Sequence, residues 1–362
     1  MPSLPRTGLP AWTVALPPLA AVVLVATWGR KPGAGVVLAV VAVSLVAAVT
    51  AAVHHAEVVA HRVGEPFGTL ILAVAVTVIE VGLIVTLMTS GGDQAATLAR
   101  DTVFAAFMIT CTGVIGLCLV AGALRHHELE FRVEGVTGTL ATLTAVAALS
   151  LVLPAFTTST PGPTYSASQL AFAGLASLAL YGVFVFVQTV RHRDYFLPPQ
   201  GALDEHATPP ATRTALTSLG LLVLSLVAVV GLAKTASPAI EDAVASAGAP
   251  RGVVGVVIAL LVLLPETAAA VRAAVRNRIQ TSLNLALGSA LASIGLTIPT
   301  IAFASIWLPG PLQLGLAPVG LVLLALTVVV SVLTVAPGRA TLMQGAVHLT
   351  VFGAFLVLAF TP

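Results

Sequence analysis

Two glutamates, Glu80 and Glu266, each lie near the middle of a long apolar run, ILAVAVTVIEVGLIVTLM (71–88) and VVGVVIALLVLLPETAAAV (253–271). A charged side chain at the centre of a bilayer costs about 2.5–3.5 kcal/mol or more, so it usually lines a polar pathway or has a partner. Two carboxylates can neutralise a divalent cation. They can also take up protons when the cation leaves, because neighbouring carboxylates raise each other's pKa. The pair therefore suggests a site that holds either a cation or protons.

A dehydrated cation needs further oxygen ligands, six to eight of them in the case of calcium. Side chains on the same run and on neighbouring apolar runs could supply these oxygens: Thr77, Thr110, Thr112, Asn284, Ser289 and Ser293. Pro265 removes a backbone donor beside Glu266 and frees a carbonyl oxygen one turn earlier. Two alternatives stay open. The hydroxyls could bond to their own helices in tight packing, and the glutamates could make structural bonds between helices.

The polar segment HHAEVVAHRVGEP (54–66) precedes the run that holds Glu80. Its histidines could sense pH. Glu57 and Glu65 are candidate gate residues that would receive cations at the cytoplasmic mouth of a pathway. The alternative is a solvated loop whose charges serve membrane topology alone.

The composition predicts a membrane protein. The chain is 58% hydrophobic and 8% charged, with a mean hydropathy of +1.05, whereas soluble domains are about 25% charged. The net charge of +2 and the lack of a basic cluster with aromatic residues argue against nucleic acid as a partner. No Walker A loop, H-E-x-x-H motif or nucleophile elbow occurs, so we expect a transporter without a cofactor and not an enzyme.

We predict an all-α polytopic membrane protein with 11 transmembrane helices. The apolar runs cover residues 11–28, 36–60, 67–90, 103–124, 136–154, 167–190, 214–236, 253–276, 281–305, 311–336 and 344–360. Most of them have the about 20 residues that a membrane span needs. The polar end of the second run predicts that this helix stops before His54.

The distribution of Lys and Arg predicts the orientation in the cell inner (plasma) membrane. One side carries 11 of the 16 Lys and Arg residues and the other carries 5, which puts the N-terminus in the cytoplasm and the C-terminus outside. The Pro-rich stretch 191–213 is predicted to be a cytoplasmic linker. It divides a leading helix (1–35) and a five-helix repeat (36–190) from a second five-helix repeat (214–362). Because five is odd, the two repeats must be inverted.

The two predicted repeats also match internally. Glu80 and Glu266 each lie 13 residues into their run, about 20 Å along a helix. From opposite sides, this depth brings both carboxylates near the midplane of an apolar core about 30 Å thick. The runs that follow, FAAFMITCTGVIGL (104–117) and LNLALGSALASIGL (283–296), both carry small and hydroxyl residues and end in Gly-Leu.

Two longer segments resemble a known family. They are AEVVAHRVGEPFGTLILAVAVTVIEVGLIVTLM (56–88), followed by TLARDTVFAAFMIT (97–110), and LLPETAAAVRAAVRNRIQTSLNLALGSALASIGLTIP (263–299). They look like the signature repeats of the cation/calcium exchanger superfamily, especially its bacterial calcium(sodium, potassium)/proton antiporter branch. The resemblance covers nearly the whole chain and implies one leading helix plus two inverted five-helix repeats. It also implies alternating access, with proton influx driving cation efflux.

The resemblance also assigns roles to single residues. It maps the essential glutamates of the two family repeats onto Glu80 and Glu266. It maps the hydroxyl and amide ligands of the second repeat onto Ser289 and Asn284, and the glutamate that opens the first motif onto Glu57.

The chain departs from the family beside both glutamates. Many members have a Gly-Asn pair there, whereas this chain has Val78-Ile79 and Leu264-Pro265. The loss of amide ligands weakens a strict calcium site and leaves room for sodium or potassium. We expect a proton-coupled calcium exporter that works by alternating access, with a monovalent cation/proton antiporter as the main alternative. A cation-coupled carrier, a membrane enzyme and a scaffold are further alternatives. Inorganic cations and membrane lipid are the expected partners, and the oligomeric state, a homo-oligomer included, stays open.

Overall fold

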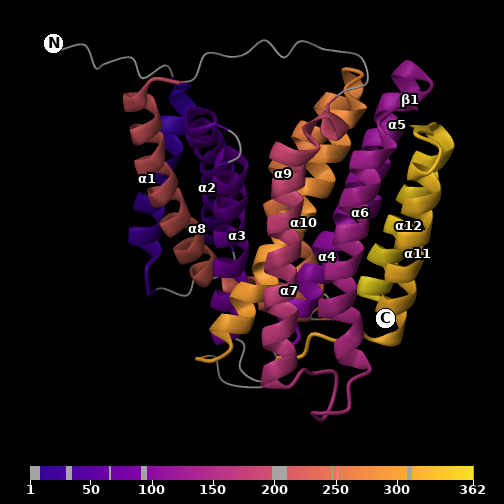
Figure 1. Ribbon diagram of the computed structural model, residues 1–362. Helices are drawn as coiled ribbons and strands as arrows, with labels where there is room; N and C mark the ends of the chain where they lie inside the picture. The colour runs from indigo at the N-terminus through magenta and orange to yellow at the C-terminus, as the bar shows by residue number, and fades with distance from the viewer. Residues whose placement is uncertain are drawn as a thin grey trace. The chain divides into compact units, whose positions relative to one another are not determined.

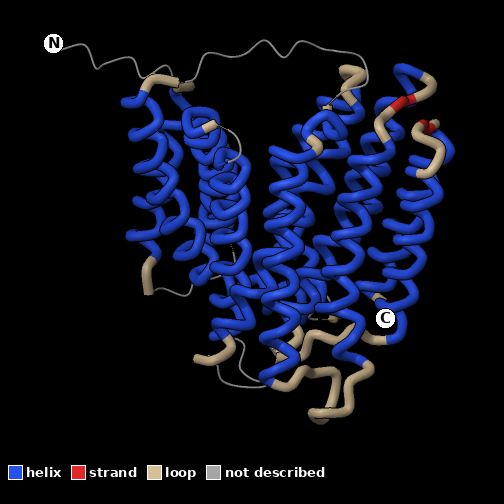
Figure 2. Tube along the Cα trace, in the orientation of Figure 1, coloured by secondary structure: helices blue, strands red, loops and turns tan. Residues whose placement is uncertain are grey.

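The structure, a computed structural model, describes residues 9–29, 35–64, 67–90, 96–197, 210–246, 248–250, 252–307 and 312–361. These residues form helices and two short strands (Figure 2). The helices are α1 (Ala11–Thr27), α2 (Val36–Val63), α3 (Phe67–Ser90), α4 (Leu98–Met108), α5 (Ile115–His126), α6 (Val133–Ala147), α7 (Ala167–Phe186), α8 (Thr212–Ser246), α9 (Gly252–Val275), α10 (Ile279–Ala304), α11 (Pro318–Val335) and α12 (Leu342–Phe360). The strands are β1 (Leu129–Glu130) and β2 (Arg339–Ala340), which pair antiparallel.

Short segments of other helical types extend or join these helices. They are the π-helical η2 (Ile109–Val114), η3 (Ala148–Val152) and η5 (Val187–Arg191), and the 3-10 segments η4 (Leu153–Ala155) and η6 (Arg193–Phe196). Because η2 joins α4 to α5 without a break, Leu98–His126 is one helix.

The helices confirm the predicted fold class. In the described part of the chain, nine helices are long and apolar enough to cross a membrane. Two shorter apolar helical segments complete the predicted set of 11: α1 (Ala11–Thr27) and the part of α3 from Ile71 to Thr86. The long apolar runs form helices because a helix pairs its own backbone groups, which no other open structure can do in lipid.

The second helix is longer than the sequence suggested. α2 continues to Val63, so the predicted stop before His54 is wrong. His55 is fully buried, and its Nε2 lies 2.9 Å from the carbonyl oxygen of Thr13 in α1. The ring centroid of His54 lies 5.5 Å from that of Trp12. The bond to Thr13 offsets part of the cost of burying His55 inside the helix, and the contact with Trp12 covers the ring of His54.

The chain forms two compact units, and the first contains α1, α2, α3 and most of α8 (Figure 1). Arg62, near the end of α2, donates a hydrogen bond of 2.8 Å to Thr212 Oγ1 at the start of α8. Farther along α8, a β-carbon on Gly231 would come within 2.6 Å of Leu24 in α1. Since α8 begins where α2 ends and then packs along α1, α2 and α8 run in opposite directions.

The second unit contains α4 to α7, α9 to α12 and both strands. In this unit, α9 lies beside the continuous helix α4–η2–α5 and runs in the same direction. Near the two helix starts, a β-carbon on Gly255 would come within 2.8 Å of the Thr102 amide nitrogen. Near the two helix ends, His126 Nε2 lies 2.9 Å from the carbonyl oxygen of Val275. The two helices therefore stay side by side over their whole length.

Helices at equivalent places of the predicted repeats run in opposite directions. α2 and α8 do so in the first unit. In the second unit, α10 turns back after α9 and so opposes the α4–η2–α5 helix. The strand pair joins the end of α5 to the start of α12. A bridge between Thr164 and Gln313 brings the start of α7 close to the end of α10. The equivalent helices α7 and α12 therefore start at opposite ends of the unit. Opposite directions are what inverted repeats require, so this part of the predicted fold class is confirmed.

One end of the second unit is rich in arginine. We call it the arginine-rich end; it comprises the ends of α5, α7 and α9, the starts of α6 and α10, and both strands. It carries Arg125, Arg132, Arg191, Arg193, Arg272, Arg276, Arg278 and Arg339. Among the described residues of the opposite end, Arg100 is the basic one. The charge difference between the two predicted sides of the membrane therefore appears within a single compact unit.

Replacing Gly255 tests the close packing of α9 on α4. In the Gly255→Ala variant, the new methyl group would meet the α4 backbone, which cannot rotate away as a side chain can. We expect a loss of about 1–3 kcal/mol of stability from overpacking, measured as a lower Tm in detergent.

Gly353→Ala is the matched control, because a β-carbon there would meet nothing within 4 Å. Alanine is a better helix former than glycine by up to about 1 kcal/mol, so this variant should keep or raise the Tm. Equal losses in the two variants would contradict the close packing.

Candidate functional site

Glu266 lies on the buried stripe of α9. The stripe includes Gly255, Ala259, Val262, Ala270 and Ala274, which recur every three or four residues and so share one face of the helix. The glutamate itself is only 9% exposed. Since α9 packs against α4, η2, α5 and α10, its buried stripe lies inside the second unit.

The height of Glu266 in this unit follows from the contacts at the two ends of α9. The glutamate lies 11 residues beyond Gly255, about 16 Å along the helix axis. The same step from Thr102 along the parallel helix reaches Gly113, within η2. Glu266 lies nine residues before the end of α9, and the same number of residues after the start of α10 reaches Gly288, which is next to Ser289. Both η2 and α10 pack against α9, so their hydroxyl residues lie near the level of the carboxylate.

The two threonines of η2 are buried but differ in their bonding. Thr112 Oγ1 donates to the carbonyl oxygen of Met108, whereas Thr110 Oγ1 has no hydrogen-bond partner among the described residues. A buried polar group without a partner costs about 1–3 kcal/mol, so Thr110 retains an oxygen that a ligand could use. The π turn that carries both residues is a feature often found at functional sites, and the sequence does not predict it.

A row of hydroxyls runs along α10. Ser293 is 2% exposed and Ser289 is half-buried. Thr297, one turn farther on, is fully buried, and its hydroxyl has no hydrogen-bond partner in the described part of the chain. The sequence analysis did not select Thr297, although its spacing of four from Ser293 places it on the same face.

Asn284 has a structural place near the arginine-rich end. Its Nδ2 donates to the carbonyl oxygen of Phe196 at 2.6 Å, and its Oδ1 accepts from Gln280 Nε2 at 2.9 Å. Gln280 Oε1 in turn accepts from the Arg132 amide at 2.7 Å. These bonds tie α10 to η6 and to the start of α6, so the amide supports the fold, and its role as a ligand stays a prediction.

Glu80 occupies the comparable place on α3 in the first unit. It is 2% exposed and shares the buried face of the helix with Thr77 one turn earlier. Thr77 Oγ1 donates to the carbonyl oxygen of Ala73 at 2.8 Å, as the packing alternative supposed, but its oxygen can still accept a bond or contact a cation. Because α3 and α9 both have 24 residues, each glutamate lies near mid-helix.

The two candidate gate residues receive no further support. Glu57 lies on the exposed side of α2, which is a helix there and not a loop. Glu65 lies outside the described residues.

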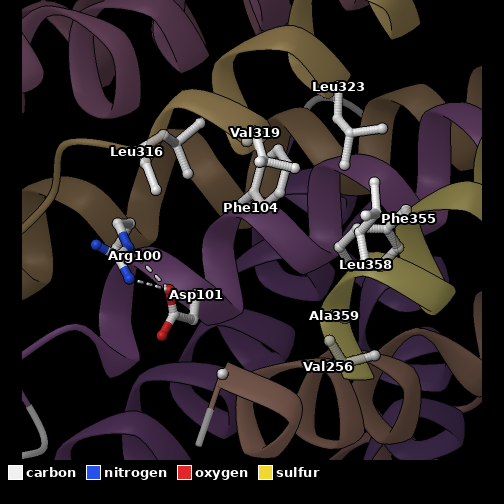
Figure 3. Close-up of a pocket in the computed structure, with 13 residues that line it drawn as sticks. Arg100, Asp101, Phe104, Val256, Leu316, Val319, Leu323, Phe355, Leu358 and Ala359 are labelled. Atoms are coloured by element: carbon white, nitrogen blue, oxygen red, sulfur yellow. Dashed lines mark hydrogen bonds and ion pairs between the residues drawn. The ribbon is translucent and has the colours of Figure 1, made fainter. Parts of the chain in front are cut away.

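A pocket of about 170 Å³ lies at the end of the second unit opposite the arginine-rich end (Figure 3). Arg100 and Asp101 form a 2.7 Å ion pair in its wall, and Thr97 donates a further hydrogen bond to Asp101. The rest of the lining is mostly apolar and comes from α4, α9, α11 and α12. Val256, in this lining, lies 10 residues before Glu266 on α9, so the pocket is separate from the buried carboxylate.

Comparisons with known proteins agree with this architecture. The family described as sodium/calcium exchanger protein matches residues 33–190 and 217–361. The y4hA protein of Sinorhizobium fredii is 49% identical over 356 residues, which cover 98% of this chain and 97% of that protein. The sodium-potassium/proton antiporter ChaA of Escherichia coli is 33% identical over 350 residues, which cover 95% and 94%.

Two solved structures share the fold. YfkE superposes with a TM-score of 0.73 at 18% identity, covering 97% of this chain and 99% of its own. The H⁺/Ca²⁺ exchanger CAX superposes with a TM-score of 0.71 at 15% identity, covering 95% and 86%. The family matches both halves of the sequence, and the relatives align over nearly their whole length. The chain therefore belongs to the sodium/calcium exchanger family, whose members are membrane-embedded secondary transporters.

Proposed function

We propose that the protein exchanges protons for inorganic cations across the membrane, with Glu80 and Glu266 as the groups for which they compete. The observation that carries this proposal is the burial of a carboxylate at mid-helix in each half of a chain from a cation exchanger family. An ionised carboxylate attracts the cation, whereas a protonated one releases it. Binding one ligand therefore excludes the other, which is the minimum requirement for antiport.

We propose sodium and potassium as the principal cations. The relative ChaA, 33% identical, is named a sodium-potassium/proton antiporter. The oxygens near the level of Glu266 are mainly the hydroxyls of Thr110, Thr112 and Ser289. These oxygens are uncharged, so they favour monovalent cations, which need less negative charge from their ligands. Asn284, an amide that a calcium site could use, is already bonded to Phe196 and Gln280.

Calcium is the second candidate. The two glutamates would balance its charge, and the sequence resembles a branch that includes calcium/proton antiporters. Calcium needs six to eight oxygen ligands, so its transport requires backbone carbonyls or water in addition to the side chains named above.

Inverted membrane vesicles with an acidic interior distinguish these ions. We expect millimolar sodium or potassium to collapse the proton gradient, reported by a pH-sensitive dye, because the cation displaces protons from the carboxylates. Glu80→Gln and Glu266→Gln should each abolish the response while the protein stays folded, since glutamine keeps the shape but cannot ionise.

Glu128→Gln serves as the control for this pair of variants. Glu128 forms an ion pair of 3.3 Å with Arg339, and both side chains are exposed, so its neutral variant should retain exchange. A response to micromolar calcium alone would assign the protein to calcium/proton exchange. Full activity in Glu80→Gln or Glu266→Gln would disprove competition at that glutamate. If no ion changes the proton gradient in vesicles with the wild-type protein, antiport is disproved.

Thr110 is predicted to contribute an oxygen to the bound cation. The Thr110→Val variant removes a buried hydroxyl that has no described partner, so stability should be kept or rise. The cation concentration for a half-maximal response should rise about fivefold, which corresponds to about 1 kcal/mol. Thr102→Val is the control, because the Thr102 hydroxyl is equally buried but donates to the Leu98 carbonyl at 2.8 Å. An unchanged half-maximal concentration for Thr110→Val would rule out this contact.

We propose that the arginine-rich end faces the cytoplasm, in accord with the charge rule for membrane proteins. Single cysteines test this orientation when introduced at the exposed residues Thr158, at the opposite end, and Asp194, at the arginine-rich end. A membrane-impermeant maleimide should label Thr158→Cys in cells with an intact inner membrane, and Asp194→Cys only after permeabilisation. The native Cys111 and Cys118 are fully buried and should stay unlabelled. The reverse pattern would invert the proposed topology.

A further inference from the structure

A histidine on the last helix is bonded to the π turn of the first half. His348 in α12 is fully buried. Its Nδ1 lies 2.8 Å from the carbonyl oxygen of Cys111 in η2, and its Nε2 lies 3.0 Å from Thr334 Oγ1 in α11. A carbonyl oxygen can only accept, so Nδ1 must carry the proton of the first bond. The imidazole thus links three helical elements through two buried hydrogen bonds.

The π turn changes the backbone hydrogen bonding around the Cys111 carbonyl. In an α-helix this carbonyl would accept from the amide of Ile115, four residues later. In η2 the Ile115 amide donates instead to the carbonyl oxygens of Thr110 and Thr112. The π turn therefore leaves the Cys111 oxygen without this α-helical donor, and His348 supplies another. The histidine bond is therefore made where the backbone departs from α-helical bonding, and a buried hydrogen bond of this kind contributes about 1 kcal/mol.

Close packing brings α12 near enough for this bond. A β-carbon on Gly116 would lie 2.9 Å from Leu349 Cδ2 and 3.1 Å from His348 Cβ. Glycine at this position is thus what allows the two helices to approach. Gly116 belongs to the Gly-Leu ending of the sequence FAAFMITCTGVIGL.

The inverted counterpart of this contact lacks the hydrogen bond. Gly295, in the second Gly-Leu ending, packs against Tyr181 of α7, whose Cβ would lie 3.1 Å from an added β-carbon. The Tyr181 hydroxyl is buried and has no hydrogen-bond partner among the described residues. α10 has no π turn at this point, although Pro299 lacks the amide that an α-helix would bond to the Gly295 carbonyl. The packing is therefore common to both repeats, whereas the histidine bond belongs to the π turn.

We propose that His348 is a positioning residue that holds η2 in its π conformation and thereby fixes the oxygens of Thr110 and Thr112 for the cation. This inference rests on the proposed function. His348 does not itself contact the transported ion in this scheme; it acts through the Cys111 carbonyl. Without the bond, the turn should shift towards a regular helix, which changes the register of the residues after Cys111 and redirects both threonine side chains.

The His348→Leu variant removes both hydrogen bonds, whereas His348→Asn keeps a donor, because the asparagine Nδ2 is as many bonds from Cα as the histidine Nδ1. Val351→Ala is the packing control: Val351 is buried on the same helix one turn later and has no polar group. Two quantities are measured on the full-length protein. Hydrogen–deuterium exchange follows the amides of η2, and vesicle assays give the sodium or potassium concentration for half-maximal proton release.

We expect His348→Leu to speed exchange in η2 and to raise the half-maximal cation concentration at least fivefold. His348→Asn should stay within about twofold of the wild type, and Val351→Ala should lower the Tm without moving either quantity. Unchanged exchange and an unchanged half-maximal concentration in folded His348→Leu would overturn the proposal, as would equal changes in the Val351→Ala control. Wild-type protein that moves no cation would refute the proposed function. The exchange at η2 would then still decide whether His348 holds the turn.

Discussion

Keeping a carboxylate in the middle of an apolar helix bundle is the constraint on which the rest of the structure depends. Removing an ionisable group from water is costly unless oxygen atoms, hydrogen-bond donors or ions surround it. Around Glu266 the chain provides oxygens by packing. Gly255 has no side chain, which lets α4 pack closely against α9. Because the two helices then run parallel, η2 lies near the level of Glu266. Small residues and hydroxyls thus act together, since the hydroxyls can lie near the level of the carboxylate only where the backbones approach.

The two repeats modify their backbones in different ways. In α9, Pro265 lacks the amide that would bond the Leu261 carbonyl, so an oxygen one turn before Glu266 loses its donor. In the helix from α4 to α5, a π turn removes the α-helical donor of the Cys111 carbonyl, and His348 bonds to this oxygen. Both devices disturb a transmembrane helix near its middle. Inversion thus reverses the direction of equivalent helices and keeps their close packing, whereas the local chemistry of each half is free to diverge.

The sequence predicted the features that follow from local pattern. Apolar runs of about 20 residues predicted the helices, and the isolated charges of Glu80 and Glu266 predicted buried groups at mid-helix. What it missed depends on partners distant in the chain. α2 continues past His54 because α1 provides contacts for the imidazoles. The π turn has no known signature in ITCTGV, and its partner His348 lies in another helix. Asn284 resembled a ligand by its position, yet its bonds go to Phe196 and Gln280.

The depth of the two glutamates limits how an ion can reach them. Glu80 lies 13 residues and Glu266 14 residues after the first residue of helices that each contain 24, so roughly 14–21 Å of helix separates either carboxylate from each helix end. No side-chain rotation covers such a distance, so the exchange that we propose would require changes in helix packing. The hydrogen bond from His348 to the Cys111 carbonyl limits which helices can separate during those changes. It joins η2 to α12 and α11, so these elements can move together at little cost, whereas separating them exposes a buried carbonyl. The hydroxyls of η2 could then keep their arrangement while the helix ends rearrange, which the proposed exchange of ions from both sides of the membrane would require.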